Sequence, residues 1–438
     1  MADLSDLPIA VIGAGPKAAA LAAKRMALVE NNFSCPPIVI IEQHEAAAHW
    51  TGEYGFTDGE QSLGTPPEKD VGFPYWTLFE GDKGHSIARF MYSNFSWCAF
   101  ITFEMSERAY YADWLDRGRP PPTHKHWAQY IAWVIKKAEA ETIIGTVHRL
   151  EETKHGWTVH IVSSGQPQKL DCQAVVITGP GTPKHGTIQI TPGCQRILNG
   201  QDYWSNFQVL RDTKQIAPLD VRPRSPRLET GGLIVVVGGG ETAASIASHM
   251  VGLRSDVEVR IITRSGTIFS RGEGYYENRM FRDTDTWREL PERVRREVIN
   301  RGDRGVFSPN AVQKLARAAN VIHRSAEIVS IAPNSYGDVV LTPQSGRPFE
   351  AQLVVIALGF ESFWFTDLFQ EDYKQALLGS KADIETTIES DLSINESFLR
   401  QKCHVPMIAG VAQGPGFPNL SCLGNMSDAI LKKYYRKK

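Results

Sequence analysis

The chain has 438 residues, 42% of them hydrophobic and 22% charged, which is ordinary for a globular protein of two or three domains. The formal net charge of −2 gives no electrostatic footprint for nucleic acid or for an anionic membrane. No apolar run is long enough for a membrane span, and the acidic N-terminus lacks the features of a signal peptide, so we expect a cytoplasmic protein.

The chain opens with a predicted strand, a glycine turn and a helix. Residues 8–12, PIAVI, are typical of a buried strand, and an alanine-rich helix follows the glycines. The next predicted strand, residues 38–42, ends in Glu42. A strand, a helix and a strand joined by a parallel crossover form a Rossmann unit.

The first glycine turn is typical of a dinucleotide site. Gly13 and Gly15 match the first two glycines of GxGxxG, and Ala18 stands in place of the third. The first glycine allows the tight turn, and the second lets the backbone approach a pyrophosphate at a helix N-terminus. The Glu42 carboxylate can accept hydrogen bonds from ribose hydroxyls.

The middle of the chain is less regular. Residues 43–118 are rich in aromatic residues, Gly and Pro and show little periodicity, and loops of this length are usually functional. Residues 124–142 predict a helix whose aromatic residues pack in the core. Its apolar positions at helical spacing are Trp127, Ile131, Val134 and Ile135. Short strands are expected within 146–162 and 174–181.

A second strand–glycine–helix unit follows a predicted Pro- and Arg-rich linker at 218–230. Its strand, LIVVV, leads into Gly238 and Gly240, and the next strand ends at Arg264 instead of an acid. A guanidinium can bind a 2′-phosphate that a carboxylate would repel, so this unit favours NADPH over NADH. Arg264 as a plain surface charge is the alternative.

The last part of the chain returns to the first unit. A further buried strand is expected within 353–360, and a polar, helix-forming stretch over 365–400. Residues 407–435 predict a strand, a Gly/Pro loop and a helix.

These elements predict an α/β fold with two Rossmann-like dinucleotide-binding domains, the second inserted in the first, plus a small helical substrate-binding region. One unit would hold FAD, and the other the NADPH that reduces it. The predicted domains are residues 1–210 for the first part of the FAD-binding domain, 228–335 for the NADPH-binding domain, 350–400 for the substrate-binding region and 401–438 for the C-terminal part of the FAD-binding domain.

Several kinds of flavoprotein fit this layout. The six cysteines contain no CxxC pair, which argues against a disulfide reductase and for reduced thiols. The histidines lack metal-ligand spacing, so no metal site is expected. A reductase or oxidase, a monooxygenase and a redox-sensing module that binds a partner protein stay open at this point.

The chain resembles the flavin-dependent N-hydroxylating monooxygenases that act on lysine or ornithine in siderophore biosynthesis, most of all the mycobactin-type lysine N6-hydroxylases. The similarity runs over nearly the whole chain. It is carried by GAGPKAAALAAK, SLGTPPEKDVGFPY, DRGRPPPTHKHW, GGGETAAS, SRGEGYYEN, DRGVFS and AQGPGFPNLSCLG. Ordered matches of this kind are more specific than one glycine motif.

The glycine turns and the resemblance together give three sets of candidate site residues. The FAD-binding set is Gly13, Gly15, Pro16, Lys17, Glu42, Gln43, Trp50, Val147, Gly424, Asn425 and Met426. The NADPH-binding set is Gly238, Gly240, Glu241, Thr242, Arg264, Asp303, Arg304 and Gly305. The substrate-binding set is Lys69, Asn278, Arg279, Met280, Phe281 and Ser427.

The resemblance implies an L-lysine N6-monooxygenase that uses FAD, NADPH and O₂ and reacts through a C4a-hydroperoxyflavin, so that the flavin and not a side chain carries the chemistry. Lys69 matches the lysine that binds the substrate carboxylate, Asn278 a substrate asparagine and Ser427 a serine near the side-chain amine. Asp303 departs from the family, which has an asparagine there. L-Ornithine or another amine as substrate, or an NADPH oxidase without hydroxylation, remains an alternative. The sequence leaves the oligomeric state open, with a homo-oligomer, dimer or tetramer, as one alternative.

Overall fold

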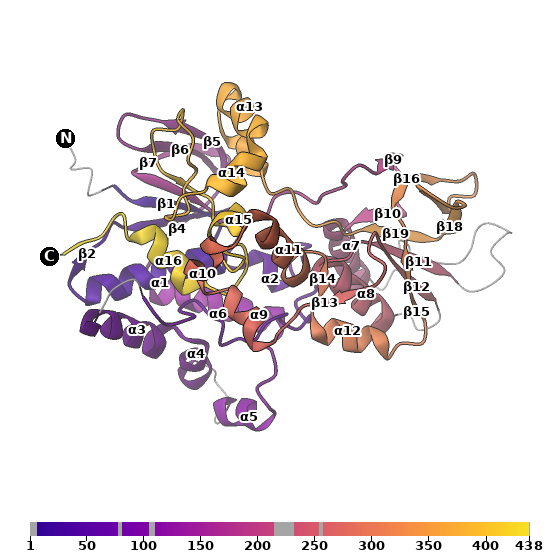
Figure 1. The fold of residues 1–438 in the computed structure, drawn as a ribbon, viewed down its shortest axis with the longest axis horizontal. Helices are drawn as coiled ribbons and strands as arrows, with labels where there is room; N and C mark the ends of the chain where they lie inside the picture. The colour runs from indigo at the N-terminus through magenta and orange to yellow at the C-terminus, as the bar shows by residue number, and fades with distance from the viewer. Residues whose placement is uncertain (1–6, 78–80, 105–109, 214–231, 254–256, 438) are drawn as a thin grey trace.

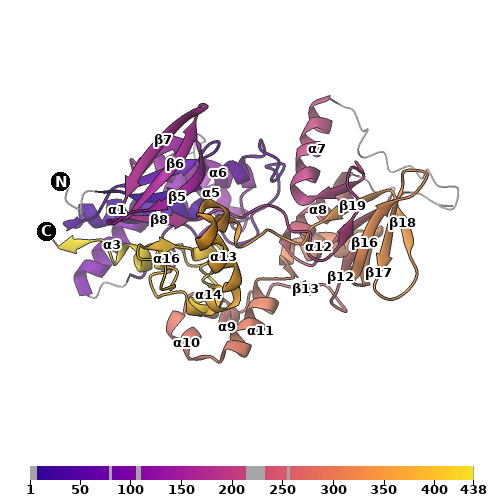
Figure 2. The ribbon, with the colours of Figure 1, turned by 90° about the horizontal axis from the view of Figure 1, so that it is seen from above.

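The computed structural model describes residues 7–77, 81–104, 110–213, 232–253 and 257–437. The predicted linker at 218–230 lies outside the described residues. Two parallel sheets occupy opposite halves of the molecule in both views, with helices around each of them (Figures 1 and 2). Both sheets carry near-continuous Val, Ile and Leu runs, as expected for parallel strands that are covered on both faces.

The first sheet is built around the N-terminal strand. In spatial order, its described strands are β20 (Cys403–His404), β8 (Ala174–Ile177), β1 (Ile9–Ile12), β3 (Ile38–Glu42) and β4 (Glu141–Ile144). Three helices pack beside one another at this sheet: α1 (Pro16–Glu30), α6 (His124–Lys137) and α16 (Leu423–Leu431). An antiparallel sheet follows β4 in the chain and consists of β5 (Thr146–Glu152), β6 (Trp157–Ser163) and β7 (Gln166–Cys172).

The second sheet repeats this arrangement. In spatial order, its described strands are β10 (Ile197–Asn199), β19 (Leu353–Ile356), β11 (Leu233–Val237), β12 (Glu258–Thr263) and β15 (Val321–Ser325). Its helices include α7 (Gly200–Thr213), α8 (Glu241–Leu253) and α12 (Pro309–Ala316). A smaller sheet packs with it: β9 (Gln189–Ile190), β16 (Ile328–Pro333), β17 (Val339–Pro343) and β18 (Phe349–Ala351).

Each central strand, β1 or β11, leads through a glycine turn into a helix and then into the strand beside it. The other neighbour of each central strand, β8 or β19, comes from much later in the chain. The strand order therefore reverses at β1 and at β11, and the crevice at such a switch point is where ligands bind in open α/β sheets. The predicted fold class is confirmed.

Helices from the second unit and from the C-terminal part of the chain gather on one side of the first sheet in the view of Figure 2. They are α9 (Tyr275–Met280), α10 (Thr284–Glu289), α11 (Glu292–Gly302), α13 (Glu371–Gly379), α14 (Lys381–Thr387) and α15 (Gly410–Gln413). Although α10 and α11 follow β12 in the chain, both contact α15 of the first unit. The second unit thus reaches back across the first.

Some sequence predictions need correction. The irregular stretch 43–118 contains four described helices: α2 (Ala48–Thr51), α3 (Gly81–Phe95), α4 (Trp97–Phe103) and α5 (Tyr110–Asp116). In α3 the buried residues Ile87, Met91 and Phe95 do recur at the helical spacing i, i+4 and i+8, so the sequence carried a helical signal here that the prediction did not use.

Two further elements differ from expectation. The predicted helix 124–142 ends at Lys137, because the chain turns after Ala138 and enters β4 at Glu141. The strand expected near 407–412 is instead the 3-10 turn η4 (Pro406–Ile408) followed by α15. Pro406 lacks a backbone N–H for a strand ladder and favours the first turn of a helix.

Two strands that lie inside the predicted ranges of other domains pair in the second sheet. The domain boundaries themselves stay predictions. β10 lies inside 1–210 but pairs with β19 in the second sheet. β19 lies inside 350–400 and pairs with β11 as well. In the described part of the chain, no helix is long and apolar enough to cross a membrane.

Candidate active site

The first glycine turn has the geometry of a phosphate cradle. Gly13 has a φ of +100°, which favours glycine, and Gly15 is the N-cap of α1, with Pro16 as the first helical residue. A Cβ added to Gly15 would have no described atom within 4 Å, so this face of the turn is open. The Glu42 carboxylate lies at the turn and accepts a hydrogen bond of 2.7 Å from the Ala14 N–H.

Residues after β3 surround this turn. Gln43 is exposed, and Trp50 in α2 packs edge to face against His124, with their ring centroids 4.8 Å apart. Val147 is the second residue of β5, two positions after Gly145, whose N–H donates to the Glu42 carbonyl at 2.8 Å. The structure therefore places the start of β5, which contains Val147, beside the end of β3.

Lys17 ties the first turn to the C-terminal loop. Its Nζ donates to the carbonyls of Pro418, at 2.9 Å, and Asn419, at 3.3 Å. Burial lowers the pKa of Lys17 to about 8. The Asn419 amide in turn donates to the Asp303 carboxylate at 3.0 Å, so a residue predicted for NADPH is joined to the loop beside the predicted FAD site.

The C-terminal candidates lie on α16. The Gly424 N–H donates to the Phe73 carbonyl at 2.8 Å, and the Asn425 side chain accepts from Trp76 Nε1 at 2.5 Å. Met426 and Ser427 are fully buried, and the Ser427 hydroxyl donates to the Gly424 carbonyl at 2.9 Å. Ser427 is thus bonded within its own helix.

The second glycine turn opens into a cavity of about 650 Å³. Gly238 has a φ of +151°, and a Cβ there would lie 2.2 Å from the Ala357 carbonyl oxygen. All the predicted NADPH residues except Gly238 line the cavity: Gly240, Glu241, Thr242, Arg264, Asp303, Arg304 and Gly305. The opposite walls include residues 179–181 and 357–362, which connect the two units.

Charges of both signs face this cavity. Arg264 is exposed just beyond β12, and Arg304 lies with its Nε 3.3 Å from an Asp303 carboxylate oxygen. Glu241, in contrast, accepts a hydrogen bond of 2.7 Å from the Ser308 N–H. Because Arg304 is paired with Asp303, the exposed guanidinium of Arg264 is more available than that of Arg304 to bind a phosphate at this turn.

Lys69 and Asn278 meet in a smaller pocket. The Lys69 Nζ donates to the Asn278 side-chain oxygen at 2.6 Å, although the two residues are 209 positions apart in the chain. The Asn278 amide donates to the Glu273 carbonyl at 2.8 Å. The pocket is lined by Thr65, Lys69, Arg271, Gly272, Glu273, Asn278, Phe281, Asn419 and Ser421.

The pocket has a volume of only about 20 Å³ while Lys69 contacts Asn278, so an amino acid would have to separate these two side chains, but the charges of its lining residues suit one. Burial lowers the pKa of Lys69, the nearby Glu273 carboxylate raises it, and the nearby Arg271 lowers it. Two cations and one carboxylate around one cavity can meet the opposite charges of an α-carboxylate and an α-ammonium. Arg271 and Glu273 were not predicted from the sequence; their position in SRGEG, five to seven residues before Asn278, was the only available signal.

The remaining substrate candidates are more peripheral. Arg279 forms an ion pair with Asp283 at 3.0 Å, and Met280 ends α9. Phe281 is buried and lines the pocket, whereas Ser427 is not among the lining residues. In the described ranges, no group of three His, Cys, Asp or Glu side chains could hold a metal ion.

Comparisons with known proteins agree with this geometry. The family model described as L-lysine 6-monooxygenase/L-ornithine 5-monooxygenase matches residues 92–325. L-lysine N6-monooxygenase MbtG of Mycolicibacterium paratuberculosis is 34% identical over 436 residues, 97% of this chain and 94% of that protein. MbtG of Mycobacterium tuberculosis H37Rv is 35% identical over the same shares.

A solved structure agrees as well. Lysine monooxygenase NbtG from Nocardia farcinica is 33% identical and superimposes with a TM-score of 0.78, covering 97% of this chain and all of that one. Similarity of this extent over nearly the full length of both chains confirms the predicted resemblance. The chain belongs to the L-lysine 6-monooxygenase/L-ornithine 5-monooxygenase family.

Proposed function

We propose that this protein is an FAD- and NADPH-dependent L-lysine N6-monooxygenase, which hydroxylates the side-chain amine of lysine with O₂. The observation that carries the proposal is the 2.6 Å contact between Lys69 and Asn278 in a pocket that also contains Arg271 and Glu273. The relation to lysine N6-monooxygenases, 34% identity over 97% of the chain, favours lysine among the amines.

The residues at the two glycine turns fit the cofactors. The open face of Gly15 and the N-terminus of α1 can take a pyrophosphate, and Glu42 at the end of β3 can bind a ribose. Thr242 and Arg264, in the larger cavity, would hold the phosphates of NADPH. When bound, FAD supplies the activation of O₂, and NADPH supplies the electrons.

The small pocket would orient the amino acid. Lys69 and Arg271 bind the α-carboxylate, while Glu273 and Asn278 bind the α-ammonium, so that only the far end of the side chain reaches toward the flavin. A lysine side chain has a pKa of about 10.4 in water. The amine must become neutral to react, and desolvation in a closed site favours that form.

The test is a comparison of amines with purified, FAD-loaded protein. NADPH oxidation and hydroxylamine product are measured with lysine, ornithine and cadaverine side by side, and NADH replaces NADPH in a parallel series. We expect product with lysine and little with cadaverine, which lacks the carboxylate. Product only with ornithine would assign the other activity of the family, and hydrogen peroxide without hydroxylamine would make the protein an oxidase. The oligomeric state, the cytoplasmic location and the role of Ser427 stay predictions.

A further inference from the structure

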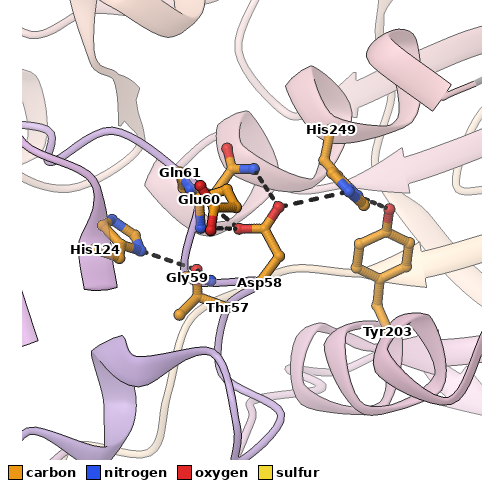
Figure 3. Close-up of polar contacts among 8 residues, drawn as sticks. All are labelled: Thr57, Asp58, Gly59, Glu60, Gln61, His124, Tyr203 and His249. Carbon is orange, nitrogen blue, oxygen red and sulfur yellow. Dashed lines mark hydrogen bonds and ion pairs between the residues drawn. The ribbon is translucent and has the colours of Figure 1, made fainter. Parts of the chain in front are cut away.

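A buried polar contact joins the two units (Figure 3). Asp58 belongs to a loop of the first unit, and His249 belongs to α8 of the second. An Asp58 carboxylate oxygen lies 3.6 Å from His249 Nε2, and His249 Nδ1 lies 2.6 Å from the Tyr203 hydroxyl. Asp58 is 8% exposed and His249 9%, so little solvent separates these groups.

Each member of this contact is held by its own unit. The Asp58 carboxylate accepts hydrogen bonds from the backbone N–H groups of Glu60, at 2.9 Å, and Gln61, at 3.1 Å, and from the Gln61 amide at 3.0 Å. The His249 ring packs against Phe207 of α7, with centroids 4.2 Å apart. Because both side chains are fixed in this way, their contact defines the position of α8 relative to the Asp58 loop.

The proton positions follow from the partners. Burial lowers the pKa of His249 to about 4, with Lys314 lowering it further and Asp58 raising it. A neutral imidazole has one donor and one acceptor. We assign the Tyr203 hydroxyl as donor to Nδ1, which leaves the Nε2–H facing Asp58. Tyr203 then bonds to His249, whose Nε2–H faces the Asp58 carboxylate across 3.6 Å, a polar contact longer than a hydrogen bond.

The Asp58 loop also touches the predicted flavin side. The Thr57 hydroxyl lies 2.9 Å from His124 Nδ1 (Figure 3). The His124 ring in turn packs against Trp50. The loop packs tightly on α7 as well, since a Cβ on Gly55 would lie 2.1 Å from the Ser205 hydroxyl oxygen. On the other side, α8 begins at the turn that lines the NADPH cavity.

We propose that Asp58 and His249 are positioning residues for the reductive step: their contact holds the second unit in the orientation in which NADPH in its cavity can reach the flavin. This inference rests on the proposed function only in that NADPH reduces bound FAD. Its consequence is that disturbing the contact slows flavin reduction while both nucleotide turns stay intact.

The experiment uses full-length variants Asp58→Asn, His249→Phe and the double variant. Phenylalanine keeps the ring packing against Phe207 but removes both polar contacts. We expect each single variant to slow anaerobic flavin reduction by NADPH about fivefold or more, the size of effect that the loss of one modest polar contact produces. The double variant should be no slower than the slower single variant, because the two changes remove one contact.

A second measurement is independent of the cofactors. In FAD-free protein, amide hydrogen exchange over residues 55–61 should rise in His249→Phe, although that change lies in the other unit. The control is His160→Phe, because His160 pairs with Glu151 at 2.8 Å within the first unit alone; it should leave both readouts unchanged. If a variant binds FAD poorly, Tyr203→Phe, which removes only the hydroxyl, repeats the test.

Wild-type reduction rates in both single variants, or unchanged exchange over 55–61 in His249→Phe, would overturn the proposal. Dithionite reduction bypasses NADPH and should proceed equally in all variants. Because flavin reduction is followed without an amine substrate, a failure to hydroxylate lysine would count against the proposed function and not against this contact.

Discussion

Lys69 is the residue through which the small pocket most directly selects its substrate. Its ammonium is close to Asn278 and shares the pocket with Arg271. Hydrogen bonds between charged groups contribute about 1.5–3 kcal/mol, which corresponds to roughly 10- to 100-fold in affinity. We therefore expect Lys69→Ala to raise the KM for lysine by about that factor, with unchanged FAD content, in steady-state NADPH oxidation assays.

Two further variants sharpen this test. Lys69→Arg keeps the charge and should recover part of the affinity, whereas Lys125→Ala removes an exposed lysine of the same region and should behave as wild type. An unaltered KM in Lys69→Ala would remove the carboxylate contact from the proposed function.

The pairing of Lys69 with Asn278 shows what residue-level prediction can reach. Their resemblance to family positions predicted both as substrate residues, and the fold brings them together across 209 positions. Arg271 and Glu273 escaped prediction because a charged residue in a glycine-rich segment is usually a solvated surface charge. Only the folded chain shows that they face the same pocket as Lys69.

At the scale of the element, the strand–turn–helix unit separates residues needed for folding from residues needed for the cofactor. A side chain at Gly13 would be strained, at a φ of +100° and with its Cβ 2.8 Å from the Thr178 hydroxyl oxygen. Gly15 has extended backbone and open space instead. Gly13 is therefore required by the fold of the turn, whereas Gly15 leaves space for a ligand.

Gly15→Ala is expected to fold normally but to bind FAD at least about tenfold more weakly, because its methyl group would occupy the space that a pyrophosphate needs against the backbone. Flavin absorbance after purification, FAD titration and the thermal midpoint of the FAD-free protein measure the two effects separately. Gly379→Ala, at the end of α13 and also in open space, is the matched control. Full FAD binding by Gly15→Ala would place the pyrophosphate elsewhere.

The elements that the sequence could predict are those whose burial is uniform. β1, β3, β11 and β19 are continuous apolar runs, and the turns after β1 and β11 have recognisable glycines. The helices within 43–118 depend on tertiary packing: α4 is held by Trp97 and Phe100 against α6, a contact that local periodicity does not report.

At the scale of the whole molecule, the insertion of the second unit into the first places the sites at the two glycine turns in one connected structure. Segments 357–402 and 178–196 connect the sheets, and residues of both segments line the larger cavity. The orientation of one unit relative to the other depends on side chains such as Asp58 and His249, which belong to no recognisable sequence motif. Such contacts could not be predicted from the sequence, because the two residues are far apart in the chain and neither belongs to a recognisable motif.

Four histidines whose pKa is lowered give a prediction about the stability of the whole molecule. Burial lowers the pKa of His49, His124, His249 and His404 to about 4 in each case, whereas an unfolded histidine titrates near pH 6.5. Between pH 4 and 6.5 the unfolded chain therefore binds more protons than the folded one. Stability must rise with pH across that window and fall as the solution is acidified, by at most about 1.4 kcal/mol per pH unit for each histidine.

His404 tests this most directly because it is fully buried, with Nδ1 2.7 Å from the Asp391 carbonyl and Nε2 2.7 Å from the Tyr434 hydroxyl. We expect His404→Gln to be less stable than wild type at pH 7.5 but to lose less stability between pH 6.5 and 4.5, because one titrating group is gone. Urea midpoints at several pH values measure both terms, with the exposed His155 changed to Gln as the control. A parallel loss of stability in wild type and His404→Gln would mean that this imidazole is already protonated in the folded protein, and the acid sensitivity would then have to come from other groups.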